Sequence, residues 1–345
     1  MTEFAHAPFD ELRRLGLDRD TESEVRTRFP ESTGMLVVER VVPGSPVEGR
    51  LAPGDILVRV DGGLVTEFVP LEGILDNAVG KSVALEIRTG SEARRVEVTP
   101  RDLHEISPAS YLQFGDAVVN QLSYQQARHL NVMPEGIYVA NPGYVFGRAA
   151  IPRSAVITEV NGIETRTLAE FRKAIQGLDD QERTTVRFYT FNEPQGTQLR
   201  TVRMDRRWFP AAECHREDDS GAWPCEPLPD VGVAPPPEPA STRFIERDDP
   251  RLAALAPSLV MVNFAMPYPV SGVAERYYHG TGVVLDAEKG LVVVDRNTVP
   301  VSMGDLRITI AGSLEVPGRV VWIHPLHNLA VVGYDPALIG VTPVR

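Results

Sequence analysis

Apolar and polar residues follow the same order twice in the first part of the chain. Residues 51–62 (LAPGDILVRVDG) and 151–162 (IPRSAVITEVNG) align four apolar pairs: Leu51 with Ile151, Ile56 with Val156, Leu57 with Ile157 and Val60 with Val160. Both copies end in an Asp-Gly or Asn-Gly turn, where glycine adopts a positive φ without steric cost. Each copy follows a glycine-led apolar strand and precedes a helical pattern, over 70–78 or 167–178, and two further strands. The repeat predicts a duplicated unit of about 100 residues, rich in strands and with one main helix.

The last part of the chain alternates short apolar segments with turns. This spacing predicts a small barrel or sandwich of six strands, over residues 258–264, 281–286, 290–295, 305–311, 318–323 and 328–334. The stretch 214–242 is acidic and rich in proline, and it shows neither helical nor strand periodicity. It is therefore expected to be an exposed linker. The predicted domains are 1–104, 105–210 and 251–345, with the linker over 211–250.

Composition narrows the range of functions. Of 345 residues, 35 are Lys or Arg and 47 are Asp or Glu, which gives a formal net charge of −12. This charge disfavours nucleic acid as the main partner, because a phosphate-binding protein needs a basic face. No apolar run reaches the ~18–20 residues that span a bilayer, and the first ten residues lack a secretory signal. Cys214 and Cys225 cannot by themselves form a disulfide scaffold or a four-ligand zinc site. Whether they pair or stay free depends on the compartment.

The first unit resembles the PDZ domains of HtrA/Deg serine proteases. The resemblance rests on Pro-Gly-Ser-Pro at 43–46, Gly-Asp-Ile-Leu at 54–57 and Val-Asp-Gly at 60–62. It implies that an extended or C-terminal peptide adds as a strand in a groove between an exposed strand edge and a helix. We expect the loop 30–34 and the strand 35–38 on one side, and the helix on the other. The implied peptide-binding residues are Gly34, Met35, Leu36, Val37, Leu71 and Leu75; for Val37 and Leu75 a core position is an equal alternative.

The second unit departs from this family pattern. Ser154-Ala155 stand where the first unit has Gly54-Asp55, and Tyr144 and Phe146 replace small turn residues. By the same resemblance its groove would lie between the strand 137–140 and the helix residues Leu168, Phe171 and Ile175. The two aromatic residues either fill this groove or dock on a neighbouring domain. Peptide binding and a purely structural role both remain open for this unit.

The third segment resembles the N-terminal barrel of an HtrA/Deg trypsin-like protease, through residues 279–299 (HGTGVVLDAEKGLVVVDRNTV) and 320–332 (VVWIHPLHNLAVV). The position of the family's catalytic His falls on Asn297, and that of its Asp falls on Asn328. An amide cannot serve as the general base for a serine or stabilise an imidazolium. No Gly-x-Ser-Gly-Gly loop occurs in the chain, so we expect this trypsin-like lobe to be a degenerate, non-catalytic one.

No other chemistry is predicted. His324 and His327 are three residues apart, but no further metal ligands are spaced near them in the sequence. Ser302 and Ser313 lie in segments whose sequence is typical of turns. We therefore expect no metal and no cofactor.

The order of two PDZ-type units, a linker and a degenerate barrel resembles the middle of double-length HtrA/Deg proteases best known from fungi. The fold class is thus mainly β, with α+β PDZ units and one six-stranded barrel lobe. The implied function is a non-catalytic, peptide-binding regulatory segment that associates with a protease half. Its implied partners are peptides or unfolded and C-terminal protein segments, neither nucleic acid nor membrane. A free-standing PDZ adaptor and an active serine hydrolase are the alternatives. The compartment stays open, being nuclear or cytoplasmic for a fungal-like protein and periplasmic for an exported one.

Overall fold

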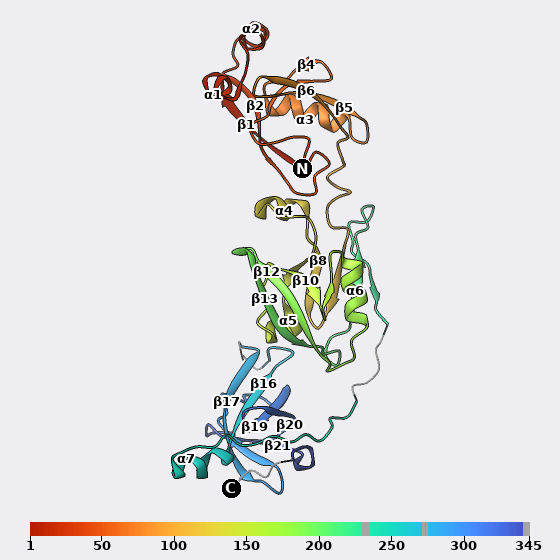
Figure 1. Cartoon of the computed structure of the whole chain (residues 1–345). Coiled ribbons are helices and arrows are strands. Elements are labelled where there is room, and N and C mark those ends of the chain that lie inside the picture. The colour runs from red at the N-terminus through yellow and green to blue at the C-terminus, as the bar shows by residue number, and fades with distance from the viewer. Residues whose placement is uncertain (230–234, 271–272, 274, 341–345) are drawn as a thin grey trace.

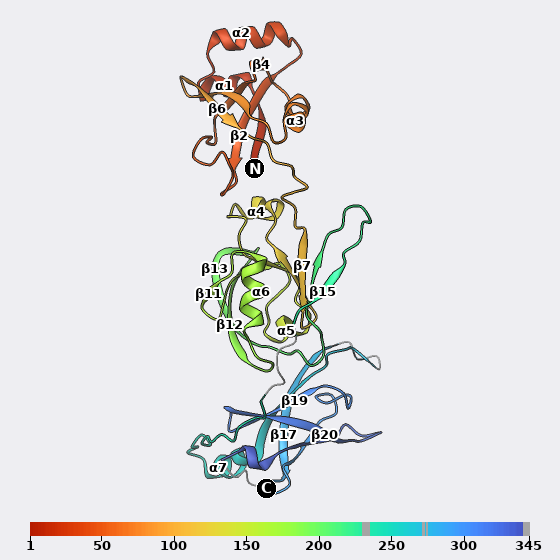
Figure 2. The ribbon, with the colours of Figure 1, turned by 90° about the vertical axis from the view of Figure 1, so that its right-hand side faces the viewer.

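A computed structural model describes residues 1–229, 235–270, 273 and 275–340. Three bodies follow one another in a row, as Figures 1 and 2 show from two sides. In chain order they are a first sheet, a second sheet and a closed barrel. We call them the first unit, the second unit and the barrel. In the described part of the chain, no helix is long and apolar enough to cross a membrane.

The first unit is a six-stranded sheet in the order β1-β2-β3-β5-β6, with β4 paired to β3. Its elements are β1 (Thr2–Pro8), α1 (Phe9–Leu15), α2 (Arg19–Arg28), β2 (Gly34–Val41), β3 (Ile56–Val60), β4 (Gly63–Leu64), α3 (Phe68–Asn77), β5 (Val83–Thr89) and β6 (Glu92–Val98). The predicted helix over 70–78 corresponds to α3. Helices α1 and α2 were not predicted.

Helix α2 is tied to α1 by a single carboxylate. Glu22 accepts hydrogen bonds from Arg13 of α1 and from Arg26, one turn further along α2, both at 2.8 Å from Nε. The hydrogen bond from Arg13, together with that from Arg26, lowers the pKa of Glu22 from 4.5 to about 2, although burial opposes the shift.

The second unit repeats this arrangement and extends it. Its sheet runs β13-β12-β10-β9-β8-β7-β14-β15, with β11 paired to β10. The elements are β7 (Ser110–Phe114), β8 (Ala117–Gln121), α4 (Tyr124–Leu130), β9 (Ile137–Asn141), α5 (Gly143–Arg148), β10 (Ala155–Val160), β11 (Ile163–Glu164), α6 (Leu168–Gln176), β12 (Arg183–Thr190), β13 (Glu193–Arg203), β14 (Ala212–His215) and β15 (Cys225–Pro227). Strands β8, β9 and β10 and helix α6 correspond to β1, β2 and β3 and helix α3.

The prediction of a linker over 211–250 is wrong for residues 212–227. Strand β14 pairs with β7, and β15 pairs with β14, so residues 212–227 form a hairpin at the edge of the second sheet. These strands of three and four residues are too short to show a period in the sequence. Backbone hydrogen bonds join β14 to β7 and β15 to β14, and a disulfide within the hairpin adds to them. Part of the expected linker, residues 230–234, lies outside the described residues.

The barrel contains the six strands expected from the sequence and closes in the order β16-β17-β18-β21-β20-β19. After α7 (Pro250–Leu255) come β16 (Leu259–Ala265), β17 (Tyr277–Asp286), β18 (Leu291–Val294), β19 (Asp305–Ile310), β20 (Leu314–Ile323) and β21 (Ala330–Tyr334). Its core is made of inward-facing aliphatic residues with Phe264 and Tyr334. Among the described strands of this body, closure leaves no free sheet edge. The last five residues of the expected barrel domain, 341–345, lie outside the described residues.

Candidate functional site

The strand expected to receive a peptide is not at the edge of the first sheet. Strand β2 pairs with β3 on one side and, over seven residues, with β1 on the other. Met35, Leu36 and Val37 of β2 are all buried in the core of the unit. Gly34 packs against β1, since a Cβ there would lie 1.9 Å from the carbonyl oxygen of Ala7. The prediction that these four residues line the groove is therefore wrong, because β1 already occupies that edge.

The edge of this sheet is β1, and α3 lies along it. Phe4 of β1 packs on the core cluster that includes Leu71 of α3, and His6 Nε2 lies 3.6 Å from Glu67 at the start of α3. Among the described residues, β2 is the only strand that pairs with β1, so the other edge of β1 is free. A free strand edge therefore lies beside a helix, displaced by one strand from the expected position.

An apolar pocket of about 310 Å3 opens at the amino end of β1. Its walls come from Thr2 and Phe4 of β1 and from Leu71 and Leu75 of α3. Leu71 and Leu75, which the sequence indicated as groove residues, therefore do face a pocket. Residues from beyond the first unit complete it, including Leu103, Ile106 and Tyr124.

In the second unit, the strand edge that corresponds to the free edge of β1 is occupied by another strand of the same chain. Strand β7 pairs with β8, the counterpart of β1, along the edge that is free in the first unit. Phe114 of β7 is buried against Phe171 of α6, with ring centroids 5.7 Å apart. The expected groove residues Leu168, Phe171 and Ile175 are all buried in the core. Strand β9, expected at the edge, lies between β8 and β10.

The two aromatic residues of α5 pack in different places, one in the core of the second unit and one against the barrel. Phe146 is buried in the core of the second unit, 5.2 Å from the ring of Phe114. Tyr144 stacks on Tyr277 of β17, with ring centroids 6.1 Å apart, and its carbonyl oxygen accepts a 2.9 Å hydrogen bond from Tyr277 Oη. Of the two readings of these aromatics, docking on a neighbour thus applies to Tyr144. Phe146 packs inside its own unit.

Buried charges join the second unit to the barrel beside this contact. Arg148 of α5 lies 3.1 Å from Asp305 of β19, and Arg203 of β13 pairs with Glu315 of β20. Burial raises the pKa of Asp305, but the nearby cations, Arg148 among them, outweigh it and hold the pKa below its usual range. Burial raises the pKa of Asp205, which lies beside this cluster. The two bodies are therefore docked through matched charges as well as stacked rings.

The two positions matched to a protease's His and Asp do come together in the barrel. Asn297 follows β18, and Asn328 precedes β21, the strand that pairs with β18. The backbone N–H of Asn297 donates a 3.1 Å hydrogen bond to Oδ1 of Asn328. Both residues line an open cleft with Arg296 and His327. The barrel thus brings together, at one cleft, the two asparagines that the sequence singled out.

His324 and His327, the other residues considered from the sequence, belong to one turn of the barrel. The rings of His324 and His327 lie 4.5 Å apart. His324 Nδ1 accepts hydrogen bonds from the backbone of Leu326 and His327, which organises the turn. Within the residues that the structure describes, no group of three or more His, Cys, Asp or Glu side chains could hold a metal ion.

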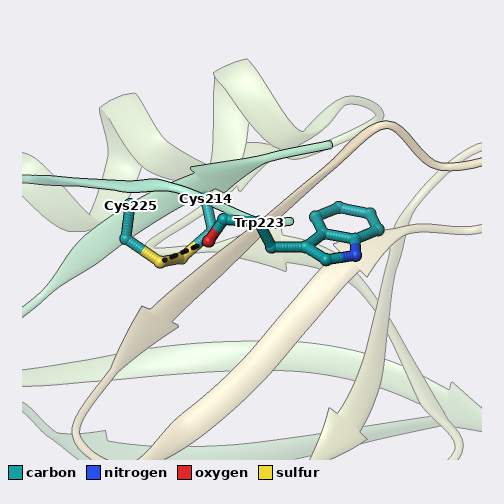
Figure 3. The surroundings of a disulfide bond; sticks show 3 residues. All are labelled: Cys214, Trp223 and Cys225. Carbon is teal, nitrogen blue, oxygen red and sulfur yellow. Dashed lines mark hydrogen bonds between the residues drawn. A yellow bond between two sulfur atoms is a disulfide. The ribbon is translucent and has the colours of Figure 1, made fainter. Parts of the chain in front are cut away.

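Cys214 and Cys225 form a disulfide between β14 and β15 (Figure 3). The cysteines face each other across the hairpin, and Cys214 is fully buried. Trp223, next to the bond in Figure 3, packs on Tyr111 of β7 at 5.3 Å between ring centroids. The sequence left the pairing open, and the structure joins the two residues.

Comparisons with known proteins agree with this architecture. A family described as a PDZ-like domain matches residues 105–181. The chain is 37% identical over 348 residues to the pro-apoptotic serine protease NMA111 of Coccidioides immitis, an alignment that covers 100% of the chain and 34% of that protein. It is 36% identical over 342 residues to the protein of that name from Aspergillus terreus, covering 98% of the chain and 33% of the relative. The chain spans about a third of the length of these curated relatives. Along its whole length, the chain is therefore homologous to a stretch of the pro-apoptotic serine proteases, which are HtrA-family proteins.

Proposed function

We propose that the first unit binds extended peptides by strand addition at the outer edge of β1. The observation that carries this proposal is the free edge of β1 beside α3, which ends in an apolar pocket. Backbone hydrogen bonds to such an edge supply affinity, and pockets for alternate side chains supply selectivity. Leu71 and Leu75 are the residues of α3 that would contact the ligand. The second unit, whose equivalent edge is paired with β7, would act as a spacer and docking platform.

We further infer that the barrel has no proteolytic activity. A serine nucleophile needs a base within hydrogen-bond reach at neutral pH. The position that matches the base is Asn297, and the position that matches its orienting acid is Asn328. Neither amide can accept a proton there, and the hydrogen bond from the backbone N–H of Asn297 to Oδ1 of Asn328 supports a structural role for Asn328.

Together these assignments describe a regulatory segment of an HtrA-like serine protease. Its peptide groove would hold unfolded or C-terminal segments of other proteins for a protease half with which it associates. A free-standing adaptor would use the same groove without a protease. The two hypotheses differ in whether an added protease half binds the chain. Binding favours the regulatory segment, and no binding favours the adaptor.

Peptide binding is tested on the full chain by fluorescence anisotropy, with labelled peptides that end in Val, Leu or Phe. Strand addition with one filled pocket is expected to give micromolar dissociation constants. Such constants correspond to a binding free energy of about −8 kcal/mol. Val79→Asp, at the rim of the pocket and 42% exposed, should weaken binding at least roughly 10-fold, because it places a charge in an apolar wall. Val69→Asp, on α3 but outside the pocket and 78% exposed, is the matched control. Absence of binding below millimolar, or equal binding by both variants, contradicts the proposal.

The absence of catalysis is tested with a fluorophosphonate probe and a casein substrate. The probe should not label the chain, and the chain should not hydrolyse casein. The double variant Asn297→His, Asn328→Asp should remain inactive, because a base and its partner have no nucleophile to activate. Labelling of a serine that is lost when that serine is replaced would instead favour the hydrolase alternative.

A further inference from the structure

A proline-rich stretch before the barrel has no part in the functions proposed above. Residues 235–239 read Pro-Pro-Pro-Glu-Pro, and we call them the proline segment. All five residues are exposed and belong to neither a helix nor a strand. Within the part of the chain that the structure describes, none of them takes part in a hydrogen bond or an ion pair. The proline segment is therefore accessible to a partner.

The chain is anchored on both sides of the proline segment. Towards the second unit, the backbone N–H of Leu228 donates a 2.8 Å hydrogen bond to the carbonyl oxygen of Ala211, and the Leu228 side chain packs on the core of that unit. Towards the barrel, the N–H of Ala240 donates to the carbonyl oxygen of Leu338 at 3.0 Å, and its own carbonyl oxygen accepts from Gly340 at 2.8 Å. The proline segment is thus displayed between two anchored points.

Proline stereochemistry restricts the shape of the proline segment. Each proline ring holds φ at about −65° and removes the backbone N–H. A residue that precedes a proline is confined to the extended region, which applies here to Pro235, Pro236 and Glu238. This favours a polyproline II helix, which has three residues per turn and no internal hydrogen bonds. One edge of such a helix carries Pro236 and Pro239, the second carries Pro235 and Glu238, and the third carries Pro237.

The barrel blocks the third of these edges. Three residues after Pro237 the same edge reaches Ala240, whose backbone is bonded to Leu338 and Gly340. A partner can therefore grip the other two edges, whereas Pro237 would face solvent.

We propose that the proline segment is a ligand for a partner protein with a groove that is lined by aromatic side chains and binds polyproline II helices. Such grooves exploit a preformed helix, which loses little conformational entropy on binding. Pro236 and Pro239 would occupy the groove. The groove would also carry a Lys or Arg beside Glu238, because desolvation of an unpaired carboxylate is costly. This interaction is independent of the free edge of β1, since here the chain is the ligand and not the receptor.

The experiment measures binding of the full chain to immobilised SH3, WW and EVH1 domains, which all bind proline-rich segments in aromatic grooves. At least one kind of domain should bind the chain with a micromolar dissociation constant. The double variant Pro236→Ala, Pro239→Ala should weaken this binding at least roughly 10-fold, because it removes both contacts in the groove. Pro237→Ala is the matched control and should change binding by less than about 2-fold. All three positions are exposed and outside helices and strands, so the replacements leave the fold intact.

Two further variants test the charge and the independence of the site. Glu238→Gln should weaken binding by roughly 2- to 5-fold, as expected for an exposed ion pair. Val79→Asp, at the pocket of the first unit, should bind the domains as the wild type does, so this proposal and the proposed function fail separately. The proposal is overturned if no domain prefers the wild type to the double variant, or if Pro237→Ala weakens binding as much as the double variant does. Tighter binding by Glu238→Gln would refute the cation in the groove.

Discussion

Replacing Phe114 tests whether β7 is a permanent part of the second unit. This strand lies where a peptide would add, so it is either an integral strand or a segment that a ligand can displace. Phe114 is 4% exposed and contacts the rings of Phe146 and Phe171, at 5.2 and 5.7 Å between centroids. Phe114→Ala removes both contacts and leaves a cavity between β7 and α6.

The expected cost follows from this packing. Truncation of a fully buried phenylalanine costs about 3–5 kcal/mol, which includes the lost transfer free energy and the cavity. In a unit of this size, each kcal/mol lowers the melting temperature by about 4 °C, so the transition of the second unit should fall by roughly 10–20 °C. Tyr111, on the opposite face of the same strand, is partly exposed and contacts Trp223. Tyr111→Ala should cost only about 1 kcal/mol.

Differential scanning calorimetry of the full chain measures these shifts. Hydrogen-exchange mass spectrometry of β8 assigns the transition to the second unit, because β8 exchanges backbone hydrogen bonds with β7. If Phe114→Ala costs no more than Tyr111→Ala, β7 detaches without loss of the core. The second unit would then be a groove with a removable strand, and the assignment of the spacer role would be refuted.

Three further predictions concern the other contacts that hold the chain. Glu22 should titrate with a pKa of about 2 in a carboxyl-carbon NMR titration. Because this pKa is depressed, its stabilisation is present above pH 4.5 and is lost as the pH falls towards 2. Glu22→Gln should therefore cost roughly 1–3 kcal/mol at pH 7 and almost nothing near pH 2. Replacing Cys214 and Cys225 by serine should increase hydrogen exchange most over residues 212–227, where the loss of local stability is about 2–3 kcal/mol. Tyr277→Phe should weaken docking of the barrel by about 1 kcal/mol and raise exchange in α5. Tyr278→Phe, whose hydroxyl bonds within the barrel, should not affect α5.

Much of the fold is readable from local pattern. The repeat at 51–62 and 151–162 identified β3, β10 and the turns after them, because alternation of apolar residues and an Asx-Gly turn act within a few residues. The six strands of the barrel followed in the same way, whereas Asn297 and Asn328 were singled out by the resemblance to a protease barrel. Leu71 and Leu75, which the family resemblance indicated, lie on one face of α3 and line the pocket. Their role in binding peptides stays a prediction.

What the sequence could not decide is which strand pairs with which. Residues 2–8 mix Phe4 and Ala7 with Glu3 and His6, a pattern without clear alternation, so β1 was missed and β2 was taken for the edge. Strands β7, β14 and β15 fill the second sheet through backbone hydrogen bonds, which carry no side-chain signature. Tyr144 acquires its docking role only because the barrel lies against it. Local periodicity specifies the elements, but edges, composite pockets and docked faces depend on contacts between residues far apart in the chain, and these exist only once the tertiary structure has formed.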